Sequence, residues 1–152
     1  QPESSAASDV YKRQAGSKDV MNLLTPGSEG STFGGYPLAS VVGTYAIKVL
    51  VDENLSKNAK KQGDYLITHL KSIKEEFPDK IKEVRGKGLL TAFEMHESKH
   101  LDGHNVSVSL LNHGVYAKET HRTTVRLAPA LTIKRGQIDR LSDAIRAVIK
   151  GL

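Results

Sequence analysis

Residues 27–38, GSEGSTFGGYPL, combine glycines with hydroxyl side chains directly before a helical pattern. Backbone N–H groups of a glycine-rich turn can converge on an anion, and the hydroxyls of Ser31 and Thr32 can donate further hydrogen bonds. The N-terminus of the following helix adds a favourable dipole. The segment lacks the Gly-Lys-Ser/Thr of a P-loop, and no strand leads into it as the dinucleotide fingerprint requires. Composition alone therefore favours a structural turn over a phosphate site.

Arg126 is the second candidate, in the stretch Thr-Val-Arg-Leu-Ala-Pro with apolar neighbours. An arginine on a short, half-buried strand needs an anionic partner. The partner is either an Asp or Glu in a structural ion pair or a substrate carboxylate, which the planar guanidinium can bind through two hydrogen bonds. The pattern leaves both alternatives open.

His96, His100 and His104 recur at a spacing of four, which raises the possibility of a metal site. A turn at Asp102-Gly103 would interrupt a helix here, so we expect a surface loop and no metal. No strand-turn-helix nucleophile elbow is visible, and no nucleophile–base set follows from the sequence. Two acid–base pairs have the spacing of helix-surface contacts, Arg135 with Asp139 and Arg140 with Asp143.

Apolar residues at spacings of three and four predict helices over 38–50 and 52–77, as two helices or one bent helix. Asp52 or Asn54 could cap the second part, and Pro78 ends it. The remaining pattern predicts either a strand pair or one bent strand hinged on the glycines at 85–88. It then predicts a helix over 104–113 ending at Gly114, strands at 115–117 and 124–127 joined by a polar turn at 119–123, and a helix over 134–149. The order predicts an α/β chain of the α+β sandwich type, a small sheet covered by helices.

Composition excludes several classes of protein. The net charge is +5, but the basic residues are spread among acidic ones and aromatics make up only 5%, so we expect no nucleic-acid partner. No apolar run is long enough for a membrane span. The absence of cysteine excludes disulfides and thiolate sites, and it favours a reducing compartment, the cytoplasm.

Residues 1–14, QPESSAASDVYKRQ, have no apolar periodicity and no initiator methionine. We expect an unrelated tail, of the kind produced when adaptor or non-coding sequence is translated, and a natural chain that continues upstream.

Three motifs in register, GSEGSTFGGYPL, VRGKGLL at 84–90 and GVYAKETHRTTVRLAPAL at 114–131, resemble the C-terminal part of the class III pyridoxal-phosphate aminotransferases. The resemblance runs from about Asp19 to Leu152, and the last motif is most similar to the branch that uses ornithine. It implies an obligate homodimer in which residues 15–49 end the large cofactor domain and connect it to a small C-terminal domain, residues 50–152.

The resemblance also implies site residues. Thr32 first, and Ser31 second, would reach the phosphate of pyridoxal 5'-phosphate in the other subunit, and Arg126 would bind a substrate carboxylate. Arg85 and Gly86 match a turn motif with a structural role. The implied reaction moves the δ-amino group of ornithine to 2-oxoglutarate. Acetylornithine or 4-aminobutyrate is an alternative donor, and a non-catalytic binding module is an alternative of another class.

The sequence departs from the family pattern at four positions, Glu29, Tyr36, Glu119 and Arg122, and Glu29 would place a negative charge near the phosphate. The Schiff-base lysine of the family lies upstream of the glycine loop. Lys48 and Lys118 are not assigned that role, so we expect the chain alone to be inactive. We also expect the apolar face of residues 38–50 to lack a cover.

Overall fold

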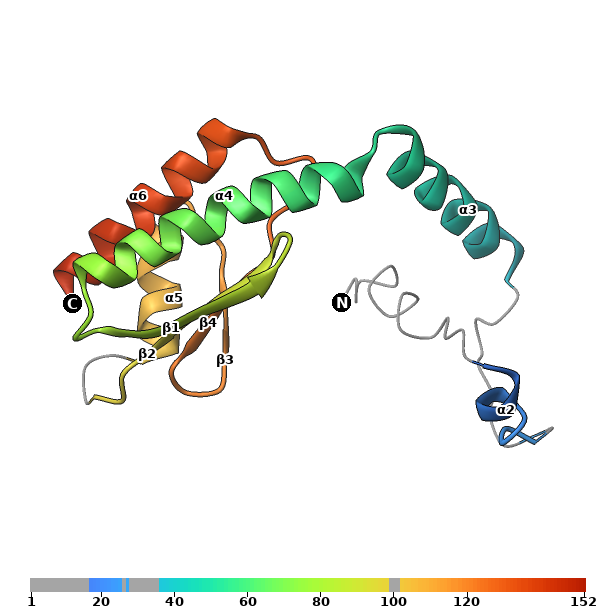
Figure 1. Cartoon of the computed structure of the whole chain (residues 1–152), viewed down its shortest axis with the longest axis horizontal. Helices are drawn as coiled ribbons and strands as arrows, with labels where there is room; N and C mark the ends of the chain where they lie inside the picture. Colours follow the sequence, from blue (N-terminus) through green and yellow to red (C-terminus); the bar gives the residue numbers. More distant parts are fainter. Residues whose placement is uncertain (1–16, 26, 28–35, 99–101) are drawn as a thin grey trace. The chain divides into compact units, whose positions relative to one another are not determined.

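The computed structural model describes residues 17–25, 27, 36–98 and 102–152 (Figure 1). The chain divides into two units, residues 1–44 and 45–152. The first contains the short helix α2 (Lys18–Met21) and the beginning of α3 (Pro37–Asp52). The predicted tail, residues 1–14, lies outside the described residues.

In the second unit, four strands form an antiparallel sheet in the order β1-β2-β4-β3. The strands are β1 (Ile81–Lys87), β2 (Leu90–Met95), β3 (Lys118–Thr120) and β4 (Thr124–Leu127), and the helices are α4 (Leu55–Glu76), α5 (Gly103–Asn112) and α6 (Arg135–Gly151). Helices α4 and α6 lie side by side over the sheet (Figure 1), and α5 packs against α6, β3 and β4. The prediction of a small sheet covered by helices is confirmed.

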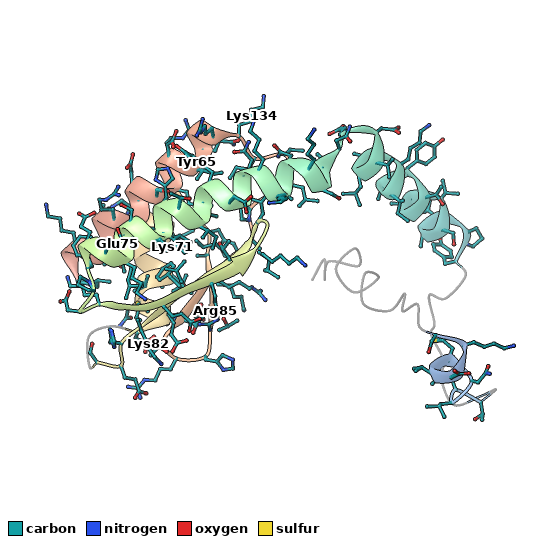
Figure 2. The ribbon with its side chains drawn as sticks, viewed as in Figure 1. Tyr65, Lys71, Glu75, Lys82, Arg85 and Lys134 are labelled. Carbon is teal, nitrogen blue, oxygen red and sulfur yellow. The ribbon has the colours of Figure 1, made fainter. Side chains whose placement is uncertain are left out.

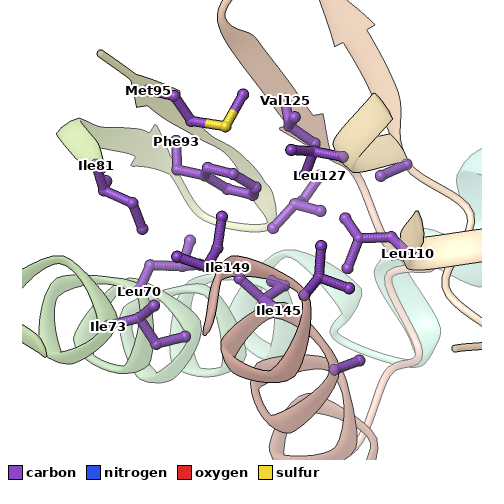
Figure 3. Packing of buried hydrophobic residues seen from close by; sticks show 14 of the residues in the cluster. Leu70, Ile73, Ile81, Phe93, Met95, Leu110, Val125, Leu127, Ile145 and Ile149 are labelled. Atoms are coloured by element: carbon purple, nitrogen blue, oxygen red, sulfur yellow. The ribbon is translucent and has the colours of Figure 1, made fainter. Parts of the chain in front are cut away.

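Apolar side chains from the helices and the sheet meet between these two layers (Figure 3). The helical spacing of Leu66, Leu70 and Ile73 directs one stripe of α4 toward the sheet, where Phe93 is fully buried. The other large, fully buried side chains are Ile81, Met95, Val106, Leu110, Val125, Ile138, Ile145 and Ile149. Side chains alternate along a strand, and the described helices α4, α5 and α6 all contribute to the core on one face of the sheet, so no described helix covers the second face.

The predicted strand pair is a hairpin, β1–β2, closed by a two-residue turn at Gly88 and Leu89. Gly88 has φ +56°, a backbone conformation that favours glycine. A Cβ atom at Gly63 of α4 would overlap the Gly88 backbone, so this helix position also requires glycine. Arg85 and Gly86, which resemble a turn motif, lie within strand β1.

Strand β3 begins at Lys118, so the strand predicted over 115–117 was wrong. The reason is the end of α5: Gly114 has φ +74°, and the Val115 N–H donates to the Leu110 carbonyl at 2.9 Å. This C-terminal cap keeps Val115 hydrogen-bonded to the end of the helix. Strand pairing therefore begins further along the chain, at Lys118. The polar turn is correspondingly shorter than predicted and contains residues 121–123.

Residues 38–77 form two helices, one of the two predicted alternatives. Of the two predicted caps, Asn54 occupies the N-cap position of α4, although its side chain makes no capping hydrogen bond, and Asp52 is the last residue of α3. Asn54 instead changes the direction of the chain through a left-handed backbone, φ 50°, which asparagine tolerates better than most residues.

Helix α3 is apolar yet exposed. Its first eleven residues, Pro37–Ile47, carry no charge. Tyr45 and Ile47 are each 64% exposed, and no residue of α3 is buried. The expected uncovered face at 38–50 is therefore present. Within the described ranges, no helix combines the length and apolarity needed to cross a membrane.

Candidate functional site

The open face of the sheet carries a row of four side-chain positions, one from each strand. Arg85 is paired with Ala92, Ala92 with Arg126, and Arg126 with Lys118. Residues paired across an antiparallel sheet share a face, so three basic side chains project from this surface. We call these four residues the basic row.

At the β1 end of the basic row, the charge is neutralised. Arg85 contacts Glu94 at 2.8 Å and Glu83 at 3.1 Å, and Lys82 contacts Glu94 at 2.7 Å. Lys82 and Arg85 lie on the side of the sheet away from α4 and α6 (Figure 2). Hydrogen bonds from Lys82 and then Arg85 lower the pKa of the Glu94 carboxyl below its ordinary 4.5. The same bond with Glu94 raises the pKa of Lys82.

At the other end of the basic row, Arg126 and Lys118 are both exposed. In the part of the chain that the structure describes, neither side chain has a hydrogen bond or ion pair with another residue. The strand is half-buried as predicted, since Val125 and Leu127 lie in the core. Arg126 occupies the opposite side of this strand, so the predicted alternative of a structural ion pair is not found among these residues.

Glu119 lies on the other face of β3 from Lys118, but the Lys118 charge still helps to lower the pKa of the Glu119 carboxyl. It is paired with buried Val125, which places it on the helix side of β3. Its carboxylate lies 3.6 Å from His104 Nδ1. A hydrogen bond from the Glu119 backbone, followed by the contact with His104, lowers the pKa of the Glu119 carboxyl.

Strand β4 holds Arg126 at a fixed place because hydrogen-bonded strands flank it on both sides. The chain after β4 is tied to α4 by Asn58, whose side-chain amide donates to the carbonyls of Leu131 at 2.6 Å and Ile133 at 3.2 Å. Gln62 donates to the Asn58 oxygen at 3.3 Å and orients the amide. A shallow, mostly apolar hollow lies between this segment and the β1–β2 turn.

Ser31 and Thr32, the predicted cofactor residues, lie outside the described residues, as does Glu29. The described end of the glycine loop leads directly into α3, which begins at Pro37 and has no acidic residue in its first turn. Ser40 donates through its backbone and its hydroxyl to the Tyr36 carbonyl, at 3.0 and 3.1 Å. An anion near this helix N-terminus would meet a favourable helix dipole. It would meet no acidic side chain from the first turn of α3.

The histidines do not form a metal site in the described ranges, which contain no cluster of three metal-ligating side chains. His96 is exposed, His104 faces Glu119, and His100 lies outside these ranges.

The two predicted helix-surface pairs differ from the structure. Asp139 accepts a hydrogen bond from Tyr65 at 2.6 Å, and Asp143 pairs with Arg146 at 3.4 Å.

Sequence reasoning did not reveal the pairing of Lys118 with Arg126 or the contacts of Asn58 with the segment after β4. The alternation of buried and exposed positions is visible in the sequence, but it does not show which residue of one strand faces which residue of another. The side-chain amide of Asn58 reaches carbonyls more than 70 residues away, and nothing in the sequence indicates that contact.

The Aminotransferase class-III family profile matches residues 10–149 of the chain. "Ornithine aminotransferase, mitochondrial" of Arabidopsis thaliana is 42% identical over 135 residues, which cover 88% of this chain and 28% of the relative. Ornithine aminotransferase of Staphylococcus epidermidis is 43% identical over 130 residues, covering 86% of this chain and 31% of the relative. The chain therefore belongs to the class III aminotransferases.

Solved structures agree with this assignment. Acetylornithine aminotransferase from Elizabethkingia anophelis superposes with a TM-score of 0.77 at 36% identity, over 88% of this chain and 33% of that protein. Ornithine δ-aminotransferase of Plasmodium falciparum gives a TM-score of 0.75 at 37% identity, over 88% of this chain and 34% of that protein. The chain thus spans about a third of the length of the relatives it matches.

Proposed function

We propose that this chain is part of an enzyme that transfers the δ-amino group of ornithine to 2-oxoglutarate, giving glutamate semialdehyde and glutamate. The observation that carries the proposal is Arg126, an exposed cation on a fixed strand with no carboxylate partner among the described residues. Relatives named for ornithine support the choice of donor. The acetylornithine aminotransferase structure favours acetylornithine as the second candidate.

Arg126 would bind and orient a substrate carboxylate. The guanidinium can donate two parallel hydrogen bonds to the two oxygens, which fixes the rotation of the carboxylate as well as its position. Because β4 is flanked by β2 and β3, the backbone at Arg126 would lose little conformational entropy when the substrate binds, and the entropy cost would come from ordering the exposed side chain. The role of the arginine is therefore positioning by a charged contact, and no proton is transferred at this side chain.

Pyridoxal 5'-phosphate, when bound, would supply the electron sink and carry the amino group between the two substrates. Thr32, and then Ser31, would hold the phosphate from the other subunit of a homodimer. The uncharged first turn of α3, which follows the loop, is compatible with that phosphate. We place the end of the cofactor domain and its connecting helix at residues 15–49, and the small domain at residues 50–152.

We expect the chain alone to be inactive, because the lysine that would hold the cofactor belongs to the upstream two thirds of such a protein. Borohydride reduction in the presence of pyridoxal 5'-phosphate should label no single lysine stoichiometrically, as mass spectrometry would show. A stoichiometric label on one lysine would contradict this expectation.

A chimera tests the proposed function. Residues 37–152 would replace the matching segment of the Staphylococcus epidermidis ornithine aminotransferase, which is 43% identical to this chain over 130 residues. We expect the chimera to form glutamate from ornithine and 2-oxoglutarate, with acetylornithine and 4-aminobutyrate as weaker donors.

The unmodified Staphylococcus epidermidis protein is the control for the chimera assay. A folded, cofactor-loaded chimera that transfers from none of the three donors would contradict the proposal. If the chimera prefers acetylornithine, then acetylornithine replaces ornithine as the proposed amino donor. The proposed reaction class stays the same.

A further inference from the structure

We propose that the contact between His104 and Glu119 fastens the edge strand β3 to helix α5, and that this fastening strengthens when the His104 imidazole is protonated. Because β3 pairs with the strand that carries Arg126, a pH-sensitive hold on β3 would control the order of the sheet beside that residue. The fastening itself does not depend on the proposed function.

Strand β3 is the shortest strand of the sheet and lies at its edge. It has three residues and pairs with β4 alone among the described strands. Segments with few backbone partners open locally more often than the centre of a fold. The residue after β3, His121, has a left-handed backbone with φ 57°. The next residue is anchored, because the Arg122 carbonyl accepts from the Gly103 N–H at 2.9 Å. Strand β3 can therefore move relative to α5 while the turn after it stays in place.

Helix α5 begins directly against β3. A Cβ atom added at Gly103 would lie 3.3 Å from the Glu119 Cβ, so the first turn of the helix packs closely on this strand. At the next position, His104 Nδ1 lies 3.6 Å from a Glu119 carboxylate oxygen. Among the residues that the structure describes, no other side-chain ion pair joins α5 to β3. This contact is therefore the charged link between the two elements in that part of the chain.

Two carboxylates lie near His104. Glu119 faces the imidazole, and Asp102 accepts a hydrogen bond from the His104 N–H at 2.7 Å. The ammonium of Lys118, on the other face of β3, helps to keep the Glu119 carboxyl ionised. On β4 the residue opposite Glu119 is Val125, which carries no charge. A positive charge on the imidazole would therefore be attracted to both neighbouring carboxylates.

The turn after β3 contributes the other charged or titratable side chains of this neighbourhood, His121 and Arg122. Neither forms an ion pair with Glu119 in the part of the chain that the structure describes. The charge that can change near neutral pH within the contact itself is that of His104.

The pH range of the fastening follows from the two partners. A hydrogen bond from the Glu119 backbone, followed by the contact with His104, lowers the pKa of the Glu119 carboxyl below its ordinary 4.5. This carboxylate therefore stays ionised where imidazoles change charge, near pH 6.5. Above that range the imidazole is neutral and the ion pair is lost. Between that range and the lowered pKa of the carboxyl, both partners are charged and the hold on β3 is strongest.

Amide hydrogen exchange of the 152-residue chain, followed by NMR and divided by the intrinsic exchange rate at each pH, tests the inference. Protection of the β3 amides should be about two- to fivefold higher at pH 5.5 than at pH 7.5, the range for an exposed ion pair. Protection of the β1 and β2 amides should not change. Glu119→Gln and His104→Gln should each remove the difference at β3. His96→Gln, at another exposed histidine, is the matched control and should keep it.

Three results would overturn the inference. The first is a pH difference at β3 that is absent from the unmodified chain or persists in both variants. The second is loss of the difference in His104→Gln alone, which would show that the imidazole acts without Glu119. The third is an equal change of protection in β1 and β2, which would mean that the whole sheet responds to pH and β3 is not fastened locally.

Discussion

Arg85 and Arg126 are the same residue type on the same face of one sheet, each paired with Ala92 from opposite sides. Arg85 contacts two carboxylates, whereas Arg126 contacts none in the described part of the chain. The two arginines therefore share residue type and exposure. They differ in whether a described carboxylate contacts the guanidinium. The Arg85 ion pair with Glu94 ties β1 to β2, whereas the lack of a described partner at Arg126 supports the proposed role of Arg126 in substrate binding.

The largest expected effect distinguishes the two arginines by activity. In the chimera, Arg126→Ala should lower kcat/KM for amino transfer about 100-fold or more, because removing one member of a charge-paired contact costs about 2–5 kcal/mol. Arg85→Ala should change kcat/KM less than about threefold. Steady-state kinetics at several 2-oxoglutarate concentrations would measure both, and similar losses in the two variants would break the comparison.

A second prediction concerns the strand that carries Arg85. A Cβ atom at Gly86 would lie 2.6 Å from the Leu90 carbonyl oxygen and 2.7 Å from the Thr91 Cα. Gly86→Ala should lower the free energy of unfolding by about 1–3 kcal/mol, the usual effect of overpacking. Gly136→Ala is the control, because a Cβ there meets nothing within 4 Å. Chemical denaturation would show whether only the first variant is destabilised.

A smaller effect is expected at Asn58, which ties the segment after Arg126 to α4. Asn58→Ala should destabilise the chain by about 1 kcal/mol through the loss of its hydrogen bonds. In the chimera, Asn58→Ala should raise KM for 2-oxoglutarate more than it lowers kcat. The reason is that the segment after Arg126 is then no longer hydrogen-bonded to α4. Asn105→Ala, at an exposed site on α5, should do neither.

The smallest expected effect is on the pH dependence of stability, through Glu94, which pairs with Arg85. The pKa of Glu94 is lowered in the folded protein, so the contribution of Glu94 to stability is present above its ordinary pKa of 4.5 and is lost as pH falls through the lowered value. Glu94→Gln should therefore reduce stability at pH 7 and flatten the acid side of the stability curve. An unchanged acid limb, measured by thermal unfolding from pH 2 to pH 7, would be the contrary result.

The sequence predicted the local structure that repeats at regular spacing. Leu66, Leu70 and Ile73 give α4 its buried stripe, and Gly114 ends α5 as expected. The strand predicted over 115–117 was wrong because the cap that follows α5 holds Val115 through a hydrogen bond that spacing does not reveal. Regular elements follow from local preference, whereas their ends depend on such contacts.

The site was only partly predictable. Arg126 could be selected from its motif, but its exposure and its pairing with Lys118 follow from strand register, which depends on the whole sheet. Arg85 was predicted to be structural from its resemblance to a turn motif, and its ion pairs with Glu83 and Glu94 supply the physical reason. Predictions for Ser31 and Thr32 concern residues outside the described ranges and stay predictions.

The most direct test of the central claim measures stability and anion binding on the same two variants of the chain. We predict that Arg85→Ala lowers the melting temperature and keeps the 2-oxoglutarate-induced amide shifts in β4. Arg126→Ala should keep the melting temperature and lose those shifts. If Arg126→Ala is the destabilised variant and retains the shifts, the assignment of the two arginines is contradicted.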